Sequence, residues 1–330
     1  MLIRYWPAET NIPFMKFNTA GVALSILMIV GSIFLLATRG LNLGVDFAGG
    51  SLIELAETDT VTVSDVRSRI PGGLTVNSAT GSDDKRLVVV RFGELDESLL
   101  GPEFAALSED EKAARASSLS NSFIVSELKR EFNLTDNDIL RNDSVGAKVS
   151  EELFWESLLA LGVATLFMLL YIAFRYSWSY AVGGIAALLH DTIGTLGLFS
   201  LLQIEFDLTT VAALLTIIGY SMNDSVVVFD RMREVRRKYK QMSGSDVINL
   251  ATNQTLSRTF LTAGAVFIAV LAMLFFGGPV LKGMSVAMLW GIFIGTYSSI
   301  FFASAIVLAL GTEVNKPSDE IDVTGFRGVP

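Results

Sequence analysis

The sequence predicts an α-helical membrane protein with six transmembrane helices and one small α+β domain outside the membrane. Three observations predict this fold. Hydrophobic residues make up 51% of the chain and charged residues only 18%, a balance more apolar than soluble proteins have. The apolar residues gather in six stretches, each long enough for the ~20 residues that cross a bilayer. A polar region, 39–152, separates the first stretch from the other five.

The chain divides into helices and connecting segments. We place the six transmembrane helices at 18–38, 153–174, 180–201, 208–230, 258–277 and 284–310. The remaining parts are an N-terminal segment 1–17, the outer domain 39–152, a basic loop 231–257 and a tail 311–330. The first helix could instead be a cleaved signal peptide. Its apolar run exceeds the ~7–15 residues of a signal core and no A-x-A site follows, so we expect an uncleaved helix.

Positive charges in the short loops predict the orientation. The loop after the fourth helix carries Arg231, Arg233, Arg236, Arg237, Lys238 and Lys240, so we expect it in the cytoplasm. The turn at 202–207 has Glu205 and Asp207 but no cation, which suits the outer side. Both termini are therefore expected in the cytoplasm, and residues 39–152 outside.

The outer region alternates strand and helix signals. Strands are expected at 51–57, 74–79, 86–92 and 139–145, and helices at 62–70 and 117–132, where apolar residues recur at helical spacing. This βαββαβ order is that of the ferredoxin-like split βαβ motif. The acidic segment 93–116 is expected to be a surface excursion. Residues 40–150 hold 19 acidic and 11 basic side chains, so this domain will not bind nucleic acid through its charge.

Asp224 is the most informative residue, because it lies inside the fourth predicted helix, in the run GYSMNDSVVVFDR. A carboxylate in hydrocarbon costs at least ~2.5–3.5 kcal/mol, so it usually has a partner and a function. Arg258 opens the fifth helix at a similar depth and can meet Asp224 if the two helices pack together. An acid that can bind and release a proton opposite an arginine predicts a proton-driven transporter.

Further polar residues share stripes with this pair. Tyr220 and Asn223 lie near Asp224 on the fourth helix, and Thr262 lies one turn after Arg258 on the fifth. These stripes could face one hydrated interior and take part in a proton relay. The alternative is that their hydroxyl and amide groups only join helices through hydrogen bonds.

His190 and Asp191 form a second polar pair, in the middle of the third helix. A histidine titrates near neutral pH, so the pair could relay protons. It could equally be a hydrogen-bonded pair that fixes helix packing. The sequence does not separate these two interpretations.

Several kinds of site are excluded by composition. The chain has no cysteine and a single histidine, so we expect no metal site and no HExxH hydrolase. It also has no P-loop pattern for a nucleotide. We therefore expect no enzyme and no cofactor, and the energy for any work must come from an ion gradient or a partner.

Long motifs resemble the SecD/SecF family of the resistance–nodulation–division (RND) superfamily. The run GVDFAGGSLIEL, which contains Gly44, Asp46, Gly49 and Gly50, is similar to the family signature. Three further stretches resemble SecF-type members in particular: LLHDTIGTLGLFSL at 188–201, TIIGYSMNDSVVVFDRMR at 216–233, and FFGGPVLKG with GTYSSIFFASAI at 275–306. One helix, one outer domain and five further helices is also the SecF arrangement.

The resemblance implies a transport function. It implies that the chain pairs with SecD as half of a twelve-helix unit in the lipid bilayer of the bacterial inner membrane. That unit works with the SecY, SecE and SecG channel and YajC, and uses the proton-motive force to help export unfolded preproteins. Asp224 and Arg258 match the family's proton-transport residues, and the signature glycines are expected to form a hinge to the outer domain.

Two alternatives stay open after the resemblance. One is half of an RND exporter of small molecules or lipids, although such exporters have twelve helices and two large outer domains in one chain. The other is a structural subunit of the translocon that conducts no protons.

Overall fold

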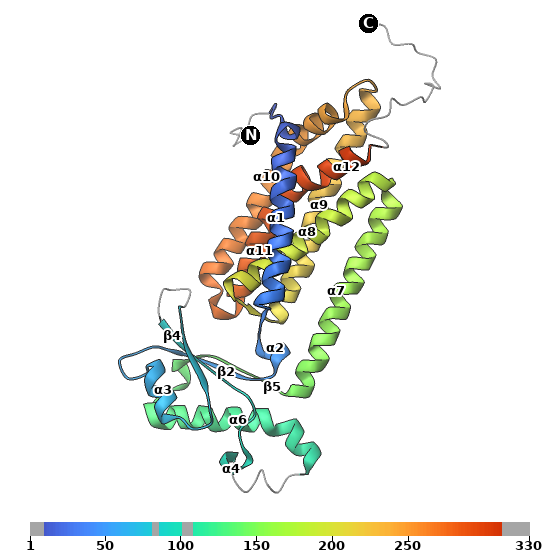
Figure 1. Ribbon diagram of the computed structural model, residues 1–330. Helices are drawn as coiled ribbons and strands as arrows, with labels where there is room; N and C mark the ends of the chain where they lie inside the picture. The colour runs from blue at the N-terminus through green and yellow to red at the C-terminus, as the bar shows by residue number, and fades with distance from the viewer. Residues whose placement is uncertain (1–9, 81–85, 101–107, 312–330) are drawn as a thin grey trace.

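The computed structural model describes residues 10–80, 86–100 and 108–311. Residues 1–9 of the predicted N-terminal segment, 312–330 of the predicted tail and part of the predicted acidic excursion lie outside these ranges. Within the described residues, long helices form a bundle and a small sheet domain lies at one end of it (Figure 1).

Six helices in the described part of the chain are long and apolar enough to cross a membrane. The first five are α1 (Asn18–Thr38), α7 (Ala147–Arg175), α8 (Trp178–Leu202), α9 (Leu208–Lys238) and α10 (Gly244–Phe276). The sixth is built from α11 (Gly278–Tyr297), the π-helix η3 (Ser298–Ala303) and α12 (Ser304–Leu310). The fold class predicted from the sequence is therefore confirmed.

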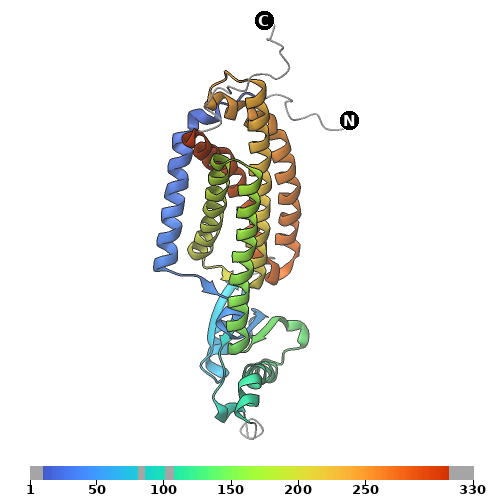
Figure 2. The same cartoon turned by 90° about the vertical axis from the view of Figure 1, so that its right-hand side faces the viewer.

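The helices differ in how deeply they are buried. In α8, α9 and the sixth helix, 50–56% of the apolar window is buried inside the protein, against 6–11% in α1, α7 and α10. The first group forms the interior of the bundle and the second surrounds it (Figure 2). Small residues permit this packing: a Cβ at Gly197 of α8 would lie 2.1 Å from the hydroxyl of Ser32 on α1.

The sheet domain has four antiparallel strands in the order β3-β4-β2-β5. They are β2 (Gly50–Ala56), β3 (Thr75–Thr80), β4 (Arg86–Phe92) and β5 (Ile139–Val145), with α3 (Val63–Arg69) after β2 and α6 (Glu109–Phe132) before β5. This order and the βαββαβ sequence of elements are those of a ferredoxin-like domain. Short helices α4 (Glu97–Leu100) and η2 (Asp136–Asp138) complete it.

The core of the sheet domain forms where helices cover the sheet. Fully buried Ile53 and Val88 of the strands pack with Val66 of α3 and with Ile124 and Leu128 of α6. The alternation of apolar and polar residues along the strands, and the helical spacing along α6, place these side chains on facing surfaces.

Several helices begin earlier than the sequence predicted, among them α6, α7, α10 and α11. Helix α6 starts at Glu109 and not at 117, so residues 109–116 of the expected surface excursion are helical. Its added turns are rich in Glu, Lys and Ala, which favour helices but carry no apolar period. Helix α10 starts at Gly244, capped by Ser243, which accepts a hydrogen bond from the amide of Asp246. Most of the basic loop 231–257 is therefore helical, as the sequence leads us to expect.

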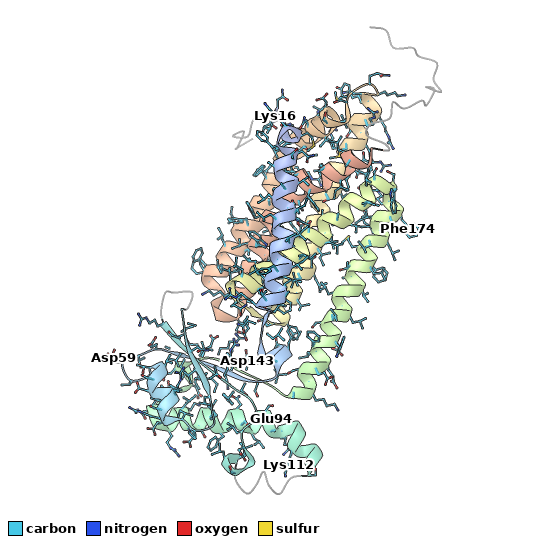
Figure 3. The ribbon with its side chains drawn as sticks, viewed as in Figure 1. Lys16, Asp59, Glu94, Lys112, Asp143 and Phe174 are labelled. Carbon is cyan, nitrogen blue, oxygen red and sulfur yellow. The ribbon has the colours of Figure 1, made fainter. Side chains whose placement is uncertain are left out.

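Charge separates the two ends of the molecule. Figure 3 shows Lys16 at the end of the bundle that is remote from the sheet domain. Asp59, Glu94 and Asp143 lie in the sheet domain. The basic residues at the end of α9, Arg236, Arg237 and Lys238, share the Lys16 end of the bundle. The predicted orientation, in which that end faces the cytoplasm, stays a prediction.

Candidate functional site

Asp224 is buried between helices, with a residue exposure of 2%. It lines a narrow cavity with Thr255 and Thr259 of α10, Thr296 of α11 and Ser299 of η3. Its Oδ2 atom is buried and has no hydrogen-bond partner in the protein. The carboxyl group is therefore shielded from solvent and only partly satisfied, which is the arrangement expected of a group that changes its protonation state.

Two neighbours of Asp224 lie at the same site. Tyr220 lies close enough to Asp224, Thr262 and Thr296 to interact with all three, and Thr296 is also near enough to donate to the Asp224 carboxyl group. The hydroxyls of Tyr220 and Thr296 are buried and lack a well-formed hydrogen bond. A buried carboxyl group with two hydroxyl groups within reach can exchange hydrogen-bond partners when its protonation state changes.

Arg258 lies on the helix next to Asp224 but does not form an ion pair with it. Helices α9 and α10 pack together, and Arg258 is near enough to attract the carboxylate. Its side chain is nevertheless exposed on the outside of the bundle. No ion pair between Asp224 and Arg258 occurs among the described residues, so direct pairing stays a prediction for another state of the protein.

The polar stripes predicted on α9 and α10 do not all face one interior. Asn223 and Thr262 are exposed, as Arg258 is, while Tyr220 is half-buried and Asp224 is buried. The single hydrated interior therefore stays a prediction for the assembled unit. The sequence gives the spacing of residues along a helix, but packing decides how each helix is rotated.

His190 and Asp191 of α8 lie in a second buried cluster. Nδ1 of His190 is 2.8 Å from Oδ1 of Asp191. The hydroxyls of Ser221 on α9 and Ser298 on η3 donate to Oδ2 at 2.5 and 2.8 Å. The imidazole stacks on Phe302, with ring centroids 4.8 Å apart. This network joins α8, α9 and the sixth membrane helix. The pair therefore contributes to helix packing, which the packing interpretation also expects.

An N-terminal segment, residues 10–17, here called the strap, packs against α10 and η3 beside the Asp224 cavity. Asn253 of α10 accepts from the amide of Ile12 at 2.8 Å and donates to its carbonyl at 2.9 Å, and Asn249 accepts from the amide of Met15 at 2.9 Å. Phe14 packs on Leu256 and Ile300, and both of these line the Asp224 cavity. The strap therefore covers one side of the site.

The segment that carries the signature glycines connects α1 to the sheet domain. After α1 come β1 (Asn42–Leu43) and α2 (Val45–Ala48), and β1 pairs in parallel with β6 (Glu205–Phe206) from the turn between α8 and α9. Gly50 has φ +97° and a Cβ there would lie 2.6 Å from the carbonyl oxygen of Phe92, so only glycine fits. Gly49 also has a positive φ, of +73°.

Asp46 and Gly44 contact the start of the helix that carries Asp224. Oδ2 of Asp46 accepts from the amide of Leu208, the first residue of α9, at 3.0 Å. Asp207 caps the same helix by accepting from the amide of Thr210 at 2.8 Å. A Cβ at Gly44 would lie 3.1 Å from the side chain of Glu205. The signature segment is thus fastened to α9 by a carboxylate at the positive end of its helix dipole.

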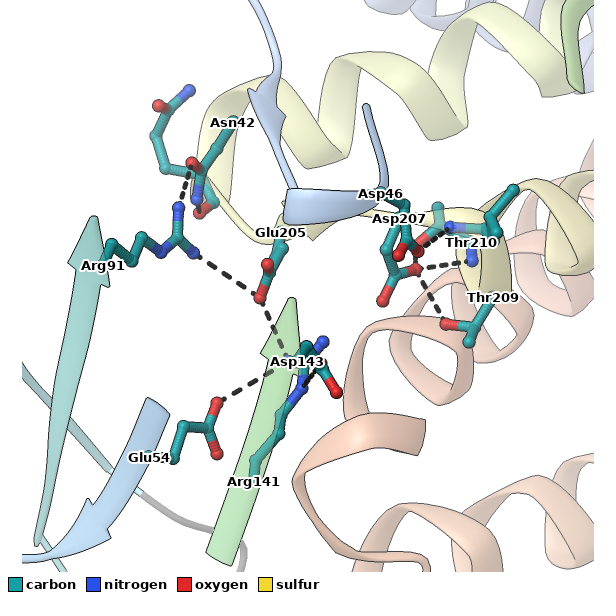
Figure 4. A network of polar contacts seen from close by, with 12 residues as sticks. Asn42, Asp46, Glu54, Arg91, Arg141, Asp143, Glu205, Asp207, Thr209 and Thr210 are labelled. Carbon is teal, nitrogen blue, oxygen red and sulfur yellow. Dashed lines mark hydrogen bonds and ion pairs between the residues drawn. The ribbon is translucent and has the colours of Figure 1, made fainter. Parts of the chain in front are cut away.

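A cluster of ion pairs, here called the clamp (Glu54, Arg91, Arg141 and Glu205), fastens the sheet domain to the bundle (Figure 4). Arg141 of β5 lies 3.2 Å from Glu205 and 3.6 Å from Glu54, and Arg91 of β4 lies 3.5 Å from Glu205. Burial raises the pKa of Glu54 although Arg141 opposes this shift. Burial alone would lower the pKa of Arg141, but Glu205 and Asp143 raise it.

Sequence reasoning missed the strap, the clamp and the π-helix. Asn253, Arg141 and Glu205 gave no signal, because each acts on a residue far away in the chain. Ser298 gave a weak one, since it lies near the end of the polar run GTYSS at 295–299 inside an apolar helix. Within the described residues, no group of three or more His, Cys, Asp or Glu side chains is placed to bind a metal ion.

Comparisons with known proteins agree with this layout. Residues 124–313 match the family model "Protein export membrane protein SecD/SecF, C-terminal", and residues 34–56 match the "SecD/SecF GG Motif". The chain is 38% identical to protein translocase subunit SecF of Rhodobacter capsulatus, with 98% of each chain covered. It is also 38% identical to SecF of Vibrio alginolyticus, over 93% of this chain and 92% of the relative.

Solved structures of longer proteins share the fold. The crystal structure of SecDF from Thermus thermophilus, described as a translocon-associated membrane protein, is 32% identical with a TM-score of 0.74. The match covers 92% of this chain and 39% of the solved one. A structure of SecDF in a super-membrane-facing form is 30% identical with a TM-score of 0.62, covering 93% and 40%. The chain therefore spans about two fifths of the solved SecDF chains.

Proposed function

This chain belongs to the SecD/SecF family of protein-export membrane proteins, and we propose that it is the SecF-type half of a proton-driven export unit. It is a multi-pass membrane protein with a role in protein export. The proposal adds the energy source, the site and the partners. Preprotein leaving the SecY, SecE and SecG channel is the substrate, SecD is the other half of the unit, and YajC is associated with it.

The observation that carries the proposal is the buried carboxyl group of Asp224 with its unpartnered Oδ2 atom. A purely structural carboxylate at this depth would accept hydrogen bonds at both oxygens, because an unsatisfied buried charge is costly. Retaining a partly satisfied acid within a membrane helix is explained if it must take up and release a proton.

The exposed polar residues near this site support a partner within the membrane. Thr216 and Asn223 on α9, with Arg258 and Thr262 on α10, are exposed on the surface of the isolated chain. Lipid tails offer these groups no hydrogen bonds, so such a face is expected to lie against protein or a hydrated path. We assign it to the interface with SecD, where the Arg258 guanidinium turns toward Asp224 in part of the cycle.

The coupling to export runs along α9. Asp224 lies in the second half of this helix, and Asp46 and Asp207 cap its start. Ionised Asp224 attracts Arg258, and a proton arriving from the outer side cancels that attraction and lets the helices shift. The clamp carries the shift to the sheet domain, and release of the proton to the cytoplasm resets the unit. Each proton supplies ~2.3 kcal/mol per 100 mV.

The location follows from the same assignment. We place the chain in the bacterial inner membrane with both termini in the cytoplasm and the sheet domain on the outer side. The acidic sheet domain and the basic opposite end of the bundle support this orientation.

The test is proton flux in lipid vesicles that contain this chain and SecD. Asp224→Asn should reduce flux and proton-dependent preprotein export to background, because an amide cannot bind the proton, while the complex with SecD still forms. Asp230→Asn makes the same chemical change at an exposed position of the same helix and should retain both activities.

Wild-type flux and export by Asp224→Asn would end the proposal and favour a structural subunit that conducts no protons. Export of small molecules or lipids from the same vesicles, without any effect on preprotein, would favour the RND exporter instead.

A further inference from the structure

The His190–Asp191 cluster contains an open proton acceptor. Asp191 accepts hydrogen bonds from Ser221 and Ser298 at Oδ2, and its Oδ1 lies against Nδ1 of His190. We place the hydrogen on Nδ1 of His190, because that atom lies 2.8 Å from Oδ1 of Asp191, which can accept it. The other ring nitrogen, Nε2, then carries a lone pair and can accept a proton. It is buried in a residue with 0% exposure and has no hydrogen-bond partner.

Packing alone does not explain this arrangement. A histidine that only fixed helix packing would have both ring nitrogens hydrogen-bonded, because an orphaned polar atom in the interior is costly. Asp191 instead orients the imidazole and fixes its tautomer, as carboxylates do for histidines that handle protons. The geometry therefore supports the relay interpretation, which stays a prediction.

The π-helix η3 connects this cluster to Asp224. Ser298 donates to Asp191, and the next residue, Ser299, lines the Asp224 cavity and shares a hydrogen bond of 2.9 Å with Ser225. Adjacent residues of one π-turn thus reach Asp191 and the cavity that Asp224 lines. On the facing helix, Ser221 contacts Asp191 and precedes Asp224 by less than one turn. π-turns inside α-helices occur frequently at functional sites.

Few other titratable groups face His190. Helix α9 presents Asp224 beyond Ser221, and α11 presents Tyr297, whose ring centroid is 6.1 Å from the imidazole. The Tyr297 hydroxyl donates to the carbonyl of Gly21 on α1 at 2.5 Å, and Ser25 of α1 donates to it at 3.2 Å. In the described part of the chain, no lysine or arginine lies within ion-pair distance of His190 or Asp191.

We propose that Nε2 of His190 is a second proton-binding site, positioned by Asp191 and coupled to Asp224 through η3. This inference rests on the proposed proton-driven function and adds a residue to it. Protonation of Nε2 converts the negatively charged pair into a neutral one. Loss of that negative charge, close to Asp224, makes it easier for Asp224 to remain ionised, so the two sites favour opposite protonation states.

The chain itself supplies a direct probe, because His190 is its only histidine. Full-length chain labelled with 13C,15N-histidine, purified on a tag without histidine and assembled with unlabelled SecD in vesicles, gives one imidazole signal in solid-state NMR. We expect the Nδ1–H tautomer at high pH and conversion to imidazolium on acidification between pH 8.5 and 4. Asp224→Asn should move the midpoint to lower pH, because a neighbouring negative charge has been removed.

A functional measurement complements the NMR. His190→Gln should keep the SecD complex, while the pH profile of proton flux changes shape. Ser200→Ala is the matched control, since Ser200 lies on the same helix, is fully buried and has an unpartnered hydroxyl; its pH profile should be that of the wild type.

The inference is overturned if the imidazole keeps one protonation state over the whole range, or if its midpoint ignores Asp224→Asn. A wild-type pH profile for His190→Gln would also overturn it. These results are distinguishable from failure of the proposed function, which would appear as normal proton flux in Asp224→Asn alone.

Discussion

Asp191 and Asp224 are the same residue type, buried among the same helices, yet their surroundings differ. Asp191 is in contact with three polar side chains that can donate to it, His190, Ser221 and Ser298. Asp224 has an oxygen atom without any protein donor. Exposure does not separate them, since the values are 1% and 2%. The number of donors does, and it indicates which carboxylate is a fixed anchor and which is free to change state.

The difference also explains how both acids are tolerated. A buried carboxylate is destabilising unless hydrogen bonds or a cation compensate for the lost water. Asp191 obtains its compensation within this chain. Asp224 lacks full compensation here, and the nearby cation, Arg258, is exposed. We infer that Asp191 stabilises the isolated subunit, while Asp224 is completed only in the assembled unit.

The largest expected effect is on stability. Asp191→Asn should lower the free energy of unfolding by about 2–3 kcal/mol, because an amide nitrogen would face the donors that now bind the carboxylate. Asp224→Asn should change it by less than about 1 kcal/mol. Thermal unfolding of the two variants in lipid–detergent micelles measures both. Equal losses would mean that the hydrogen bonds around Asp191 do not make it an anchor.

A smaller effect is expected from Arg258→Lys. The variant should conduct protons several-fold more slowly than the wild type, because a compact ammonium replaces a planar guanidinium that can bind a carboxylate through two nitrogens. Its unfolding temperature should not change, since the side chain is exposed. Proton flux in SecD-containing vesicles measures the first effect, with Arg237→Lys at the exposed end of α9 as the control.

Wild-type flux in Arg258→Lys would argue that Asp224 needs only a positive charge nearby and no particular pairing geometry. A loss as complete as that of Asp224→Asn would instead make the guanidinium indispensable, and would place Arg258 on the proton path itself.

The sequence was most informative where a residue or segment differs in polarity from the residues around it. Six apolar stretches were enough to predict the fold class. The succession of strand and helix signals over residues 51–145 was enough to predict the order of elements in the outer domain. Asp224, His190 and Asp191 were visible because polar residues are rare within apolar helices. None of these inferences required knowledge of which helices are neighbours.

The remaining features depend on rotation and on distant contacts. Arg258 is at the expected depth on α10, but its direction is set by packing that spacing along one helix does not specify. The clamp joins Arg141 to Glu205, which are 64 positions apart, and the strap joins Ile12 to Asn253 across 241. Surface charges and amides occur throughout the chain, so nothing in the sequence distinguishes the ones that pair.

Glu54 extends the comparison to a third buried carboxyl, outside the membrane, and should give the smallest effect. Folding raises its pKa, chiefly through burial, so the stability it contributes is full below the unfolded pKa of about 4.3 and is lost as pH rises through the folded pKa. Glu54→Gln should therefore flatten the pH dependence of the sheet domain. At pH 7 its stability should equal the wild type or exceed it by up to about 1 kcal/mol.

Hydrogen exchange of the β2 amides in the full chain, corrected for the intrinsic effect of pH, measures this local stability. Glu205→Gln is the informative contrast, because Arg91 and Arg141 both contact that carboxylate and its loss should weaken protection at neutral pH. If Glu54→Gln weakened protection as much, Glu54 would be a required partner of Arg141. The rule drawn from Asp191 and Asp224, that donors rather than burial decide a carboxylate's role, would then not extend to the clamp.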